Sequence, residues 1–472
     1  MTSQAAEILF PIENFKKSWR EEIVEFINER LTRIIEHNPM ENFDDISSAI
    51  FQNKSDILGN LILGLIKRKF SHLLDQEHYE CPNCKKRLKA WNKKVKRKIE
   101  SLGGSLYLYR PYFYCKNCKQ GFYPLDEALG LAPSPKQYDI QDVEAWLSSE
   151  LPFKTAAEAF NRCTGDGLSA DHMFDTVNNI ANHFDILDVC PTKDEIENQI
   201  KELSKGKFRR PIMMLAIDGA HVPVRPEPSP WKGKRGAGGW KEAKGFRIYL
   251  IDKDRIIHLI SWHQVQSDDE FAEGLLKIKN AELIPEDKVR LCIIGDGAVW
   301  LWKKAREIFP KAKEILDFYH CSEYIHEVAN IQYGKSTKKA QEWVEATFTR
   351  LFHNNIDDVI QGLKIMKPVS TSAEETIDDV IGYLSKRRDQ VNYGAAKRAG
   401  YHIGSGAIES ANKFIGHVRL KRSGAWWYIT NANNILKLRC AKYNGTYDSV
   451  IQKYKDLNRK KTYSKFNSDQ KT

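Results

Sequence analysis

Two pairs of closely spaced cysteines constrain the fold of this 472-residue chain more than any other feature. The sequence CPNC spans Cys81 to Cys84 and CKNC spans Cys115 to Cys118, with thirty residues between the pairs. Two such knuckles joined by strands describe a zinc ribbon, in which four thiolates close a tetrahedral site around one structural zinc ion. The segment SLYLYRPYFY between them is aromatic and strand-like. We therefore predict one zinc ion and a zinc ribbon over residues 79–125; the alternative is four reduced cysteines without a metal.

The first half of the segment between the cysteine pairs is strongly basic. From Lys85 to Lys98 the sequence KKRLKAWNKKVKRK contains nine basic residues and no acid, and the whole chain has a net charge of +11. Such a balance favours a polyanionic partner, because neutralising phosphates releases counterions, although a basic protein without that partner fits the charge equally well. We predict DNA contacts by four residues of this segment: Lys93, Lys94, Lys96 and Arg97.

Composition argues against several other classes of protein. The chain is 42% hydrophobic and 29% charged, as in an ordinary soluble globular protein, and its length predicts two to four domains. No run of about 18 uninterrupted apolar residues occurs, so no membrane span is expected. The start of the sequence lacks the pattern of a secretory signal, and we expect a cytoplasmic protein.

Helical periodicity brackets the predicted ribbon. Residues 1–78 carry apolar residues at helical spacing and predict an N-terminal helical region, and residues 126–205 return to the same pattern. Within the second stretch, a helix over Thr155–Cys163 is followed by a glycine-containing turn and a helix capped by Ser169. This outline fits a DNA-binding helix-turn-helix, and it fits an ordinary helical bundle equally well.

From Arg209 the apolar pattern changes to short strand-like runs. These runs are PIMMLAIDGAHVPV, FRIYLID, IIHLISWHQV and VRLCIIGDGAVWLW, and they predict a mixed sheet flanked by helices. Residues 321 to about 400 read as helical again, and a final helical block runs from Ile408 to Tyr443. The polar, basic tail over residues 446–472 is expected to be disordered.

Three acids stand where a sheet could bring them together. Asp218 and Asp296 each end a strand-like run and precede a glycine. A single Asp-Gly pair favours a plain turn, but two pairs in one sheet indicate a ligand site at its edge. Glu409 follows the glycine-rich HIGSG in the first turn of a helix, where glutamate is also common. Because a few carboxylates suffice for two Mg²⁺ or Mn²⁺ ions that catalyse phosphodiester transfer, we predict these three acids as the ligands, with Asp218 bridging both ions.

The order of these motifs resembles a known family. IDGAHV, GDGAVW, LDFYH and IGSGAIES, followed by RLKRSGAWW, are similar to the bacterial insertion-sequence transposases of the Kra type, which are related to the Mutator-like DDE transposases. The resemblance covers roughly residues 209–445, and Asp218, Asp296 and Glu409 match the three acids of that family. It implies an RNase H-like α/β catalytic core over residues 206–325, an all-helical insertion over 326–400 and a final catalytic helix region over 401–445.

The resemblance also implies a fold class and a function. The fold class is multidomain α+β, with a zinc ribbon and a helical DNA-binding region before the RNase H-like domain. The function is DNA transposition, in which the protein binds the terminal inverted repeats of its element, cleaves a strand and transfers it to target DNA. Holding two element ends implies a homodimer or a larger assembly. The expected location is the bacterial cytoplasm, in association with the nucleoid.

Two further residues match the same family. In LDFYH, Asp317 and His320 correspond to a motif that lies near the active site of related transposases. Asp317 is therefore a rival for the second metal-ligand position. We prefer Asp296, because it closes the fourth strand, where the second acid of an RNase H-like sheet belongs. His320 either orients the scissile phosphate or a nearby acid, or is a hydrogen-bonded core histidine.

Two segments of the catalytic part are candidates for contact with DNA. The loop WKGKRGAGGWKEAKG, which is expected to join the first two strands, either becomes ordered on DNA or stays solvated; its basic candidates are Lys232, Lys234 and Arg235. After Glu409, Arg419, Lys421 and Arg422 are predicted to hold the strand backbone. Trp426 is predicted to stack on an unpaired base, although a core position for both Trp426 and Trp427 fits equally well.

Two other functions are compatible with parts of the pattern. A DNA-binding zinc-ribbon protein with an inactive RNase H-like domain should have lost an acid, whereas all three are present. A structure-specific nuclease of the same fold should lack the long helical insertion and the end-binding region.

Overall fold

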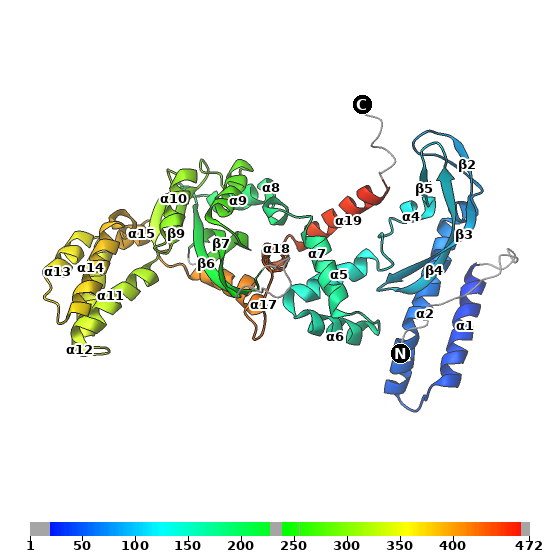
Figure 1. The fold of residues 1–472 in the computed structure, drawn as a ribbon, viewed down its shortest axis with the longest axis horizontal. Helices are drawn as coiled ribbons and strands as arrows, with labels where there is room; N and C mark the ends of the chain where they lie inside the picture. The colour runs from blue at the N-terminus through cyan, green and yellow to red at the C-terminus, as the bar shows by residue number, and fades with distance from the viewer. Residues whose placement is uncertain (1–18, 227–237, 254, 464–472) are drawn as a thin grey trace. The chain divides into compact units, whose positions relative to one another are not determined.

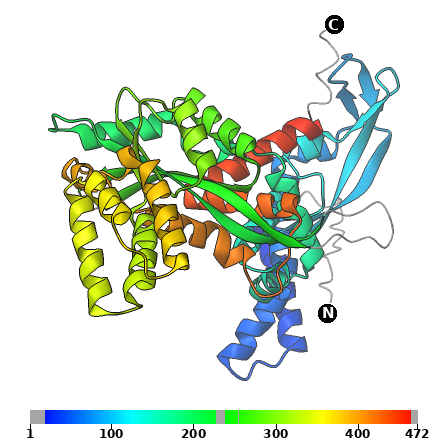
Figure 2. The same cartoon turned by 60° about the vertical axis from the view of Figure 1, so that its left-hand side comes forward.

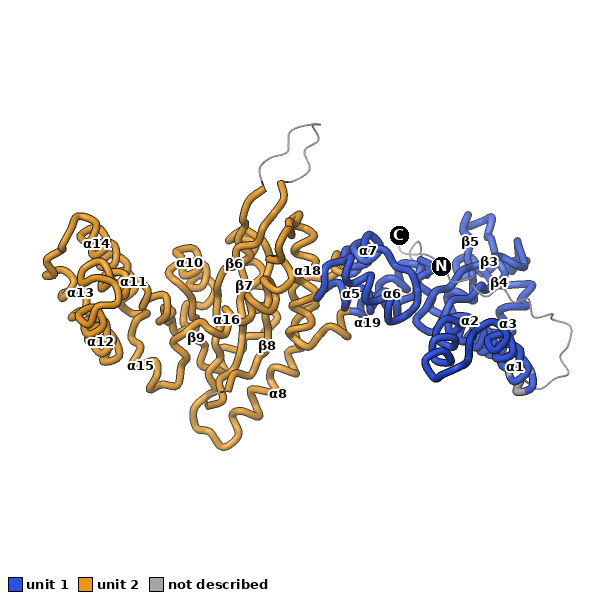
Figure 3. The backbone as a smooth tube through the Cα atoms, turned by 90° about the horizontal axis from the view of Figure 1, so that it is seen from below, with its two compact units in different colours: residues 1–180, 451–472 blue, residues 181–450 orange. Residues whose placement is uncertain are grey.

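The computed structural model describes residues 19–226, 238–253 and 255–463 of a mixed α+β protein. The chain forms two compact units, one from residues 1–180 with 451–472 and the other from residues 181–450 (Figure 3). Of the helices that the structure describes, none combines the length and the apolar character that a bilayer crossing requires.

The described part of unit 1 starts with helices and continues with short antiparallel sheets. The helices are α1 (Trp19–His37), α2 (Phe43–Lys69) and α3 (Ser71–Leu74). Strand β1 (His78–Glu80) pairs with β2 (Arg87–Lys89), and β4 (Gly104–Cys115) lies between β3 (Asn92–Ser101) and β5 (Gln120–Phe122) (Figure 1). The strands occupy the segment in which the sequence predicts the ribbon.

Helix α2 lies directly on strand β4. Leu63 and Ile66 of the helix share a buried cluster with Leu106 and Leu108 of the strand. The approach is close at Gly59, where an added Cβ would lie 2.3 Å from the carbonyl oxygen of Ser105. A residue with a side chain at this position would therefore force the helix away from the sheet.

The next helices along the chain are α4 (Pro124–Ala128), α5 (Tyr138–Glu150), α6 (Phe153–Thr164) and α7 (Ala170–Ala181). Helix α6 ends at Gly165, whose φ of 74° lies in the left-handed region that favours glycine. The hydroxyl of Ser169 then accepts the backbone N–H of His172 in the first turn of α7. A helix, a glycine turn and a second helix therefore follow one another as the sequence predicts.

The C-terminal tail differs from expectation, because most of it is ordered. Residues 447–463 form helix α19 (Tyr447–Tyr463) instead of a disordered segment. Its apolar residues recur at helical spacing, and Tyr447, Val450, Ile451 and Tyr454 are buried. The hydroxyl of Tyr454 donates to Gln141 of α5 at 2.8 Å. The basic composition of the tail concealed this narrow apolar stripe.

Unit 2 is built on a five-stranded mixed sheet. Its strands are β6 (Ile212–Val224), β7 (Gly239–Asp252), β8 (Arg255–Val265), β9 (Arg290–Gly295) and β10 (Lys313–Leu316), in the spatial order β10-β9-β6-β7-β8. Strands β6, β7 and β8 are antiparallel, whereas β9 runs parallel to β6 and β10 parallel to β9. The first strand does not end at Asp218, as the sequence suggested, but continues to Val224 because Ala220, Val222 and Val224 are also buried.

Helices cover both faces of this sheet. On one face, α9 (Asp268–Asn280) and α10 (Val299–Ile308) pack through an aromatic row in which Phe271 contacts Phe246 of β7 and Trp300. On the other face lie α16 (Gly406–Ala411), the π-helical turn η3 (Asn412–His417), α17 (Val418–Leu420) and α18 (Ile429–Tyr443). Arg247 of β7 fixes this layer by donating to the carbonyl oxygen of Ala407 at 2.8 Å. Before the sheet, η1 (Ile186–Val189) and α8 (Lys193–Ser204) enter the unit.

A helical segment separates β10 from α16. It consists of α11 (Phe318–Tyr333), α12 (Lys338–Phe352), α13 (Ile356–Lys364), α14 (Thr371–Ser385), η2 (Arg388–Gln390) and α15 (Tyr393–Arg398), which form one group, drawn mainly in yellow in Figure 2. Phe318 anchors the group to the end of β10 through ring contacts with Phe348, Phe352 and Tyr393.

Candidate functional site

The four paired cysteines form a compact metal-type site in unit 1. All four sulfur atoms lie within 4.8 Å of one another. Sγ of Cys81 is 3.8 Å from Sγ of Cys118, and Sγ of Cys84 is 3.6 Å from Sγ of Cys115. Four thiolates at the usual Zn–S distance are separated by about 3.8 Å along the edges of the tetrahedron. The donor set and its spacing therefore fit one structural zinc ion.

Short turns and an aromatic shell hold these cysteines. In both knuckles the residue after the second cysteine has a left-handed backbone, with φ of 58° at Lys85 and 53° at Lys119. Tyr79, Phe113 and Phe122 pack together beside the cluster. Each knuckle is thus a local structure, and the packed rings join the two.

The acids of the strand-like runs lie side by side in unit 2. Strand register pairs Gly295 of β9 with Ile217 on one side and with Leu316 on the other. Asp218, Asp296 and Asp317 directly follow these three residues, so one acid lies within β6 and one directly after the end of each of β9 and β10. Neighbouring strands are about 5 Å apart. The sheet therefore brings the three acids to one edge.

Glu409 joins this edge from helix α16. The hydroxyl of Ser405, at the start of that helix, lies 3.0 Å from Oε1 of Glu409 and also contacts Oδ2 of Asp317. Because a hydroxyl carries one proton, it donates to only one of the two carboxylates at a time. Ser405 is buried and links the helix to the strand edge.

Burial and nearby charged groups shift the pKa of Asp218. The pKa of Asp218 is raised to about 7, mainly by burial and also by the carboxylates of Asp296 and Glu409. The backbone N–H of Gly219, 2.8 Å from Oδ1, and the nearby His320 act in the opposite direction. Residues from three distant parts of the chain therefore act on the carboxyl group of Asp218.

The carboxylates of Asp218, Asp296, Asp317 and Glu409, here called the acid cluster, are grouped less tightly than the four cysteine sulfur atoms. Among the described residues, only the four cysteines form a group of three or more metal-type ligands with all ligand atoms within 4.8 Å. Carboxylates of like charge repel one another, and two ions about 3.5 to 4 Å apart spread their ligands over a wider area. The oxygen donors match the preference of Mg²⁺ or Mn²⁺ for hard ligands.

Asp317 differs from its neighbours because it is enclosed. Its side chain is 0% exposed. Oδ1 accepts the backbone N–H groups of Tyr319 at 3.0 Å and Ser405 at 3.3 Å, and Oδ2 contacts the Ser405 hydroxyl. His320 is partly exposed and lies between two acids, with Nε2 at 3.9 Å from Asp317 and Nδ1 at 3.6 Å from Glu323. His320 is therefore at the rim of the acid edge and not in the core.

The helical segment covers one end of this edge. Oδ1 of Asp296 accepts the backbone N–H of Ala298 at 2.9 Å in the turn after β9. A Cβ at Gly297 would lie 2.6 Å from the ring of Tyr383, and the guanidinium of Arg387 donates to the Gly297 carbonyl oxygen. The glycine after the second acid thus permits the close approach of α14 and of the residues that follow it.

The basic residues predicted on the ribbon have different environments. Lys94 and Lys96 are exposed on β3, and the amine of Lys96 lies 3.9 Å from the centre of the Tyr107 ring. Lys93 is exposed and paired with Glu77. Arg97 is turned inward, where it pairs with Asp126 at 2.5 Å and donates to a backbone carbonyl. Arg97 therefore serves the structure, and we leave it out of the surface available to DNA.

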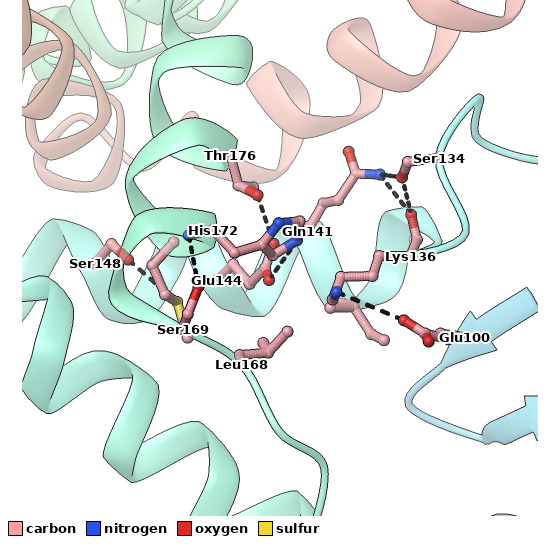
Figure 4. Close-up of polar contacts among 12 residues, drawn as sticks. Glu100, Ser134, Lys136, Gln141, Glu144, Ser148, Leu168, Ser169, His172 and Thr176 are labelled. Carbon is pink, nitrogen blue, oxygen red and sulfur yellow. Dashed lines mark hydrogen bonds and ion pairs between the residues drawn. The ribbon is translucent and has the colours of Figure 1, made fainter. Parts of the chain in front are cut away.

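The predicted helix-turn-helix lacks a basic face on its second helix. The exposed residues of α7 include Asp171, Asp175 and Asn179. Figure 4 shows instead a buried polar network on its inner side, where Glu144 of α5 accepts the Thr176 hydroxyl at 2.6 Å and lies 3.2 Å from Nε2 of His172. Burial raises the pKa of Glu144 to about 7. This network joins the helices, and the acidic outer face does not favour phosphate contacts.

The candidates after Glu409 also divide into exposed and buried residues. Lys421 and Arg422 are exposed, and Trp426 is 43% exposed. Arg419 is 2% exposed and stacks on Trp427, whose indole N–H donates to the carbonyl oxygen of Leu420. Trp427 and Arg419 therefore belong to the interior. The candidates Lys232, Lys234 and Arg235 lie outside the described residues.

Sequence reasoning overlooked several polar residues around the acids. Asn412 donates from Nδ2 to Oδ2 of Asp218 at 2.7 Å, and Ser405 joins Asp317 to Glu409. Both lie in the same GSGAIESAN stretch as Glu409, and their one-turn spacing from it was the available signal. Trp240 was also missed: it is 59% exposed, and the amine of Lys421 lies 5.9 Å from its ring centre.

Comparison with solved structures gives a match to the Drosophila P element transposase strand transfer complex. The sequence identity is 12%, the TM-score is 0.25, and the match covers 71% of this chain and 92% of that one. A likeness at this TM-score carries no argument about fold or function. No curated protein matches the sequence. A family profile described as an uncharacterised protein family matches residues 37–455, and the chain therefore belongs to the family UPF0236.

Proposed function

We propose that this protein is a transposase that cleaves and transfers DNA strands at the edge formed by Asp218, Asp296 and Glu409. The observation that carries the proposal is the pairing of Ile217 with Gly295, because it sets the two aspartates side by side on adjacent parallel strands. The Ser405 hydroxyl, which contacts both Glu409 and Asp317 at the end of the neighbouring strand, supports Glu409 as the third acid. Three carboxylates at one sheet edge are what two-metal-ion phosphodiester chemistry needs.

The strand order supports an RNase H-like assignment for unit 2. Three antiparallel strands followed by two parallel ones, in the order β10-β9-β6-β7-β8, put the first acid on the first strand and the second after the fourth. Helices fill the interval between the fifth strand and the helix of the third acid. Both features agree with the resemblance to Kra-type transposases, and we propose the sheet as the catalytic core and residues 326–400 as its insertion.

The second ligand in this proposal is Asp296 and not Asp317. The oxygens of Asp317 are already occupied by Tyr319 and Ser405, and its side chain is enclosed. Asp296 is partly exposed beside Asp218. Asp317 is then a positioning residue that fixes the start of the Glu409 helix through Ser405.

The residues present fit Mg²⁺ or Mn²⁺. Bound cations would activate the attacking hydroxyl and stabilise the leaving oxygen. The chain itself holds Asp218 in orientation through the N–H of Gly219 and the amide of Asn412. Burial is the main cause of the raised pKa of Asp218, and the carboxylates of Asp296 and Glu409 add to it; a bound divalent cation would favour the ionised form of this group. His320, at the rim, can face a phosphate of the strand that is cut.

Exposed aromatic and basic residues near the start of β7 offer a contact surface for DNA. Trp240 and Trp426 are exposed, and Lys421 lies beside Trp240. Exposed rings stack on unpaired bases, and lysine neutralises phosphates. In the N-terminal part we propose that the zinc-bound ribbon, with Lys93, Lys94 and Lys96, binds the ends of the element, and that the protein acts on DNA as a homodimer or a larger assembly.

The direct test is cleavage of DNA that carries the sequences flanking the gene, with Mg²⁺ or Mn²⁺. The wild-type protein is compared with Asp218→Asn and Glu409→Gln, and Asp378→Asn, an exposed acid of α14, serves as the matched control. Because loss of a metal ligand removes several kcal/mol of transition-state stabilisation, we expect a fall of about 10³-fold or more for the first two variants. Equal cleavage by all four proteins would remove the catalytic assignment, and no cleavage by any of them would favour an inactive DNA-binding protein.

A further inference from the structure

One cross-strand row of the unit 2 sheet links Asp218 to a buried histidine. Register pairs Asp218 of β6 with Gly245 of β7, and Gly245 with His263 of β8. Side chains of directly paired residues project from the same face of an antiparallel sheet. An added Cβ at Gly245 would lie 2.2 Å from a ring carbon of His263. The absence of a side chain in the middle strand therefore lets the imidazole lie across it, toward Asp218.

Asn412 lies on the same face and contacts Asp218 directly. Its amide nitrogen donates to Oδ2 of Asp218 at 2.7 Å, and the residue is 4% exposed. It begins the π-helical turn η3, three residues after Glu409 on the same stretch of helix. Residues three apart project from one side of a helix, so the turn that carries Glu409 also presents Asn412 to the sheet. π-Helical turns are rare and frequent at functional sites.

Three buried polar atoms near Asp218 make no hydrogen bond of normal geometry. They are the two ring nitrogens of His263 and Oδ1 of Asn412. Burial lowers the pKa of His263 to about 3, while the contact with Asn412 opposes that fall. The imidazole is therefore neutral, with one N–H donor. Asn412 already uses its amide nitrogen on Asp218, and its oxygen needs a donor, which His263 can supply.

We propose that His263 and Asn412 form a positioning pair for Asp218. The imidazole N–H of His263 holds the amide oxygen of Asn412, and this fixes the amide nitrogen on the Asp218 carboxylate. A small rotation of either side chain completes the contact. Without His263, the amide of Asn412 can turn over and present its oxygen to the carboxylate, which repels it. The expected effect on catalysis rests on the proposed function, whereas the contact itself does not.

The contact is tested by NMR on the full chain labelled with ¹⁵N-histidine. We expect one slowly exchanging imidazole N–H signal that disappears in His263→Gln and shifts in Asn412→Ala. Gly245→Ala tests the same row without removing either partner, because the new methyl group displaces the His263 ring; it should shift that signal as well. If no protected imidazole proton is assigned to His263, or if it is unmoved in Asn412→Ala, the positioning pair is refuted whatever the protein catalyses.

The consequence is tested by a double-mutant cycle in the cleavage assay. We expect His263→Leu and Asn412→Ala each to lower the rate about ten-fold, as loss of a residue that orients a ligand commonly does, and the double variant to be no worse than the more damaging single one. His263→Gln keeps a donor and should recover the rate to within about three-fold of wild type. Multiplying effects, or no recovery by glutamine, would refute the pair as a catalytic device.

A matched control separates positioning from general loss of stability. Gln390 is also buried in unit 2, and its amide donates to Glu314 at 2.6 Å. Gln390→Leu should lower the melting temperature and multiply with His263→Leu in the rate. A wild-type protein that shows the protected imidazole proton but cuts no DNA would support the contact and refute the proposed function.

Discussion

The cysteine cluster of unit 1 and the carboxylate edge of unit 2 are two candidate metal sites built in different ways. The cysteines come from two short knuckles, and all four sulfur atoms lie within 4.8 Å of one another. The carboxylates come from residues nearly two hundred positions apart in the sequence. The sheet and a helix position them, but less close together than the sulfur atoms. A closed site of four soft ligands suits a structural ion, whereas an open set of acids leaves positions for substrate.

The two sites are therefore expected to have different roles, one in stabilising the fold and the other in catalysis. The knuckles are short and share one small aromatic cluster, so a zinc ion bound by the four cysteines would stabilise much of the fold of this segment. The acid edge lies on a sheet whose strands are buried on both faces, and its fold does not need a cation. Changes at the first site should therefore unfold the ribbon, and changes at the second should alter catalysis while the fold remains.

The largest effect is expected at Asp296. Asp296→Asn should lower cleavage about 10³-fold with little change in melting temperature, because Asp296 is partly exposed and, in the proposed site, its loss removes a metal ligand. Asp317→Asn should lower the melting temperature by several degrees and cleavage by only about ten-fold, because the buried Asp317 binds Tyr319 and Ser405. Thermal unfolding and the cleavage rate of both variants check this. The reverse pattern would make Asp317 the second ligand.

The second prediction concerns the cluster of four cysteines in unit 1. Cys115→Ser should lose the single equivalent of zinc and the ordered structure of the ribbon, because apparent binding free energies of structural zinc are on the order of 10 kcal/mol. Metal analysis and hydrogen exchange of strands β3 and β4 measure both losses. Cys163→Ser is the matched control, since Cys163 is exposed and outside the cluster. Unchanged zinc in Cys115→Ser would rule out the site.

How far the sequence predicts this molecule differs between the two sites. The cysteine spacing by itself predicts the cluster, because each knuckle is local and four thiolates leave few alternatives. The strands carrying Asp218 and Asp296 were also predictable from their apolar runs. What the sequence could not give is cross-strand register: the row of Asp218, Gly245 and His263 exists only once three strands are paired.

The burial of individual side chains also could not be predicted from residue type. Arg97 and Arg419 looked like phosphate ligands, but each is held by neighbours inside the protein. Helix α19 looked like a disordered basic tail because its apolar stripe is narrow. In these cases the same side chain serves either a surface or a core, and only the surrounding tertiary structure decides between them.

A third prediction compares two carboxyl groups whose pKa values are both raised to about 7. Burial is the largest cause for both groups; the carboxylates of Asp296 and Glu409 add to it at Asp218, whereas the Thr176 hydroxyl and Lys136 oppose it at Glu144. The folded pKa of Glu144 exceeds its ordinary value of 4.5, so its contribution to stability is full below about pH 4.5 and is lost as pH rises through about 7. The difference corresponds to about 3 kcal/mol.

Hydrogen exchange of helices α5 and α7 between pH 5 and pH 8 measures this effect locally. After correction for the intrinsic exchange rate, protection in the wild type should fall toward pH 8, and Glu144→Gln should flatten the dependence. Burial lowers the pKa of the neighbouring His172, so that a compensating ion pair does not form at neutral pH. Glu158→Gln, at an exposed position of α6, should leave the wild-type profile unchanged. A flat wild-type profile would mean that Glu144 stays ionised in its pocket, and Mg²⁺ should have no influence in either case.

The smallest effect is expected at the basic surface of the ribbon. Lys94 is exposed on β3, so Lys94→Ala should weaken binding of double-stranded DNA only a few-fold at about 0.15 M salt. It should also reduce the slope of log K against log salt by about 1, because one phosphate contact is lost. Lys338→Ala removes the same charge from a side chain that is 89% exposed in unit 2 and should leave the slope unchanged. Equal slopes for both variants would mean that Lys94 of the predicted ribbon does not contact DNA. Unit 2, which carries the carboxylates, would then be the part of the protein that binds DNA.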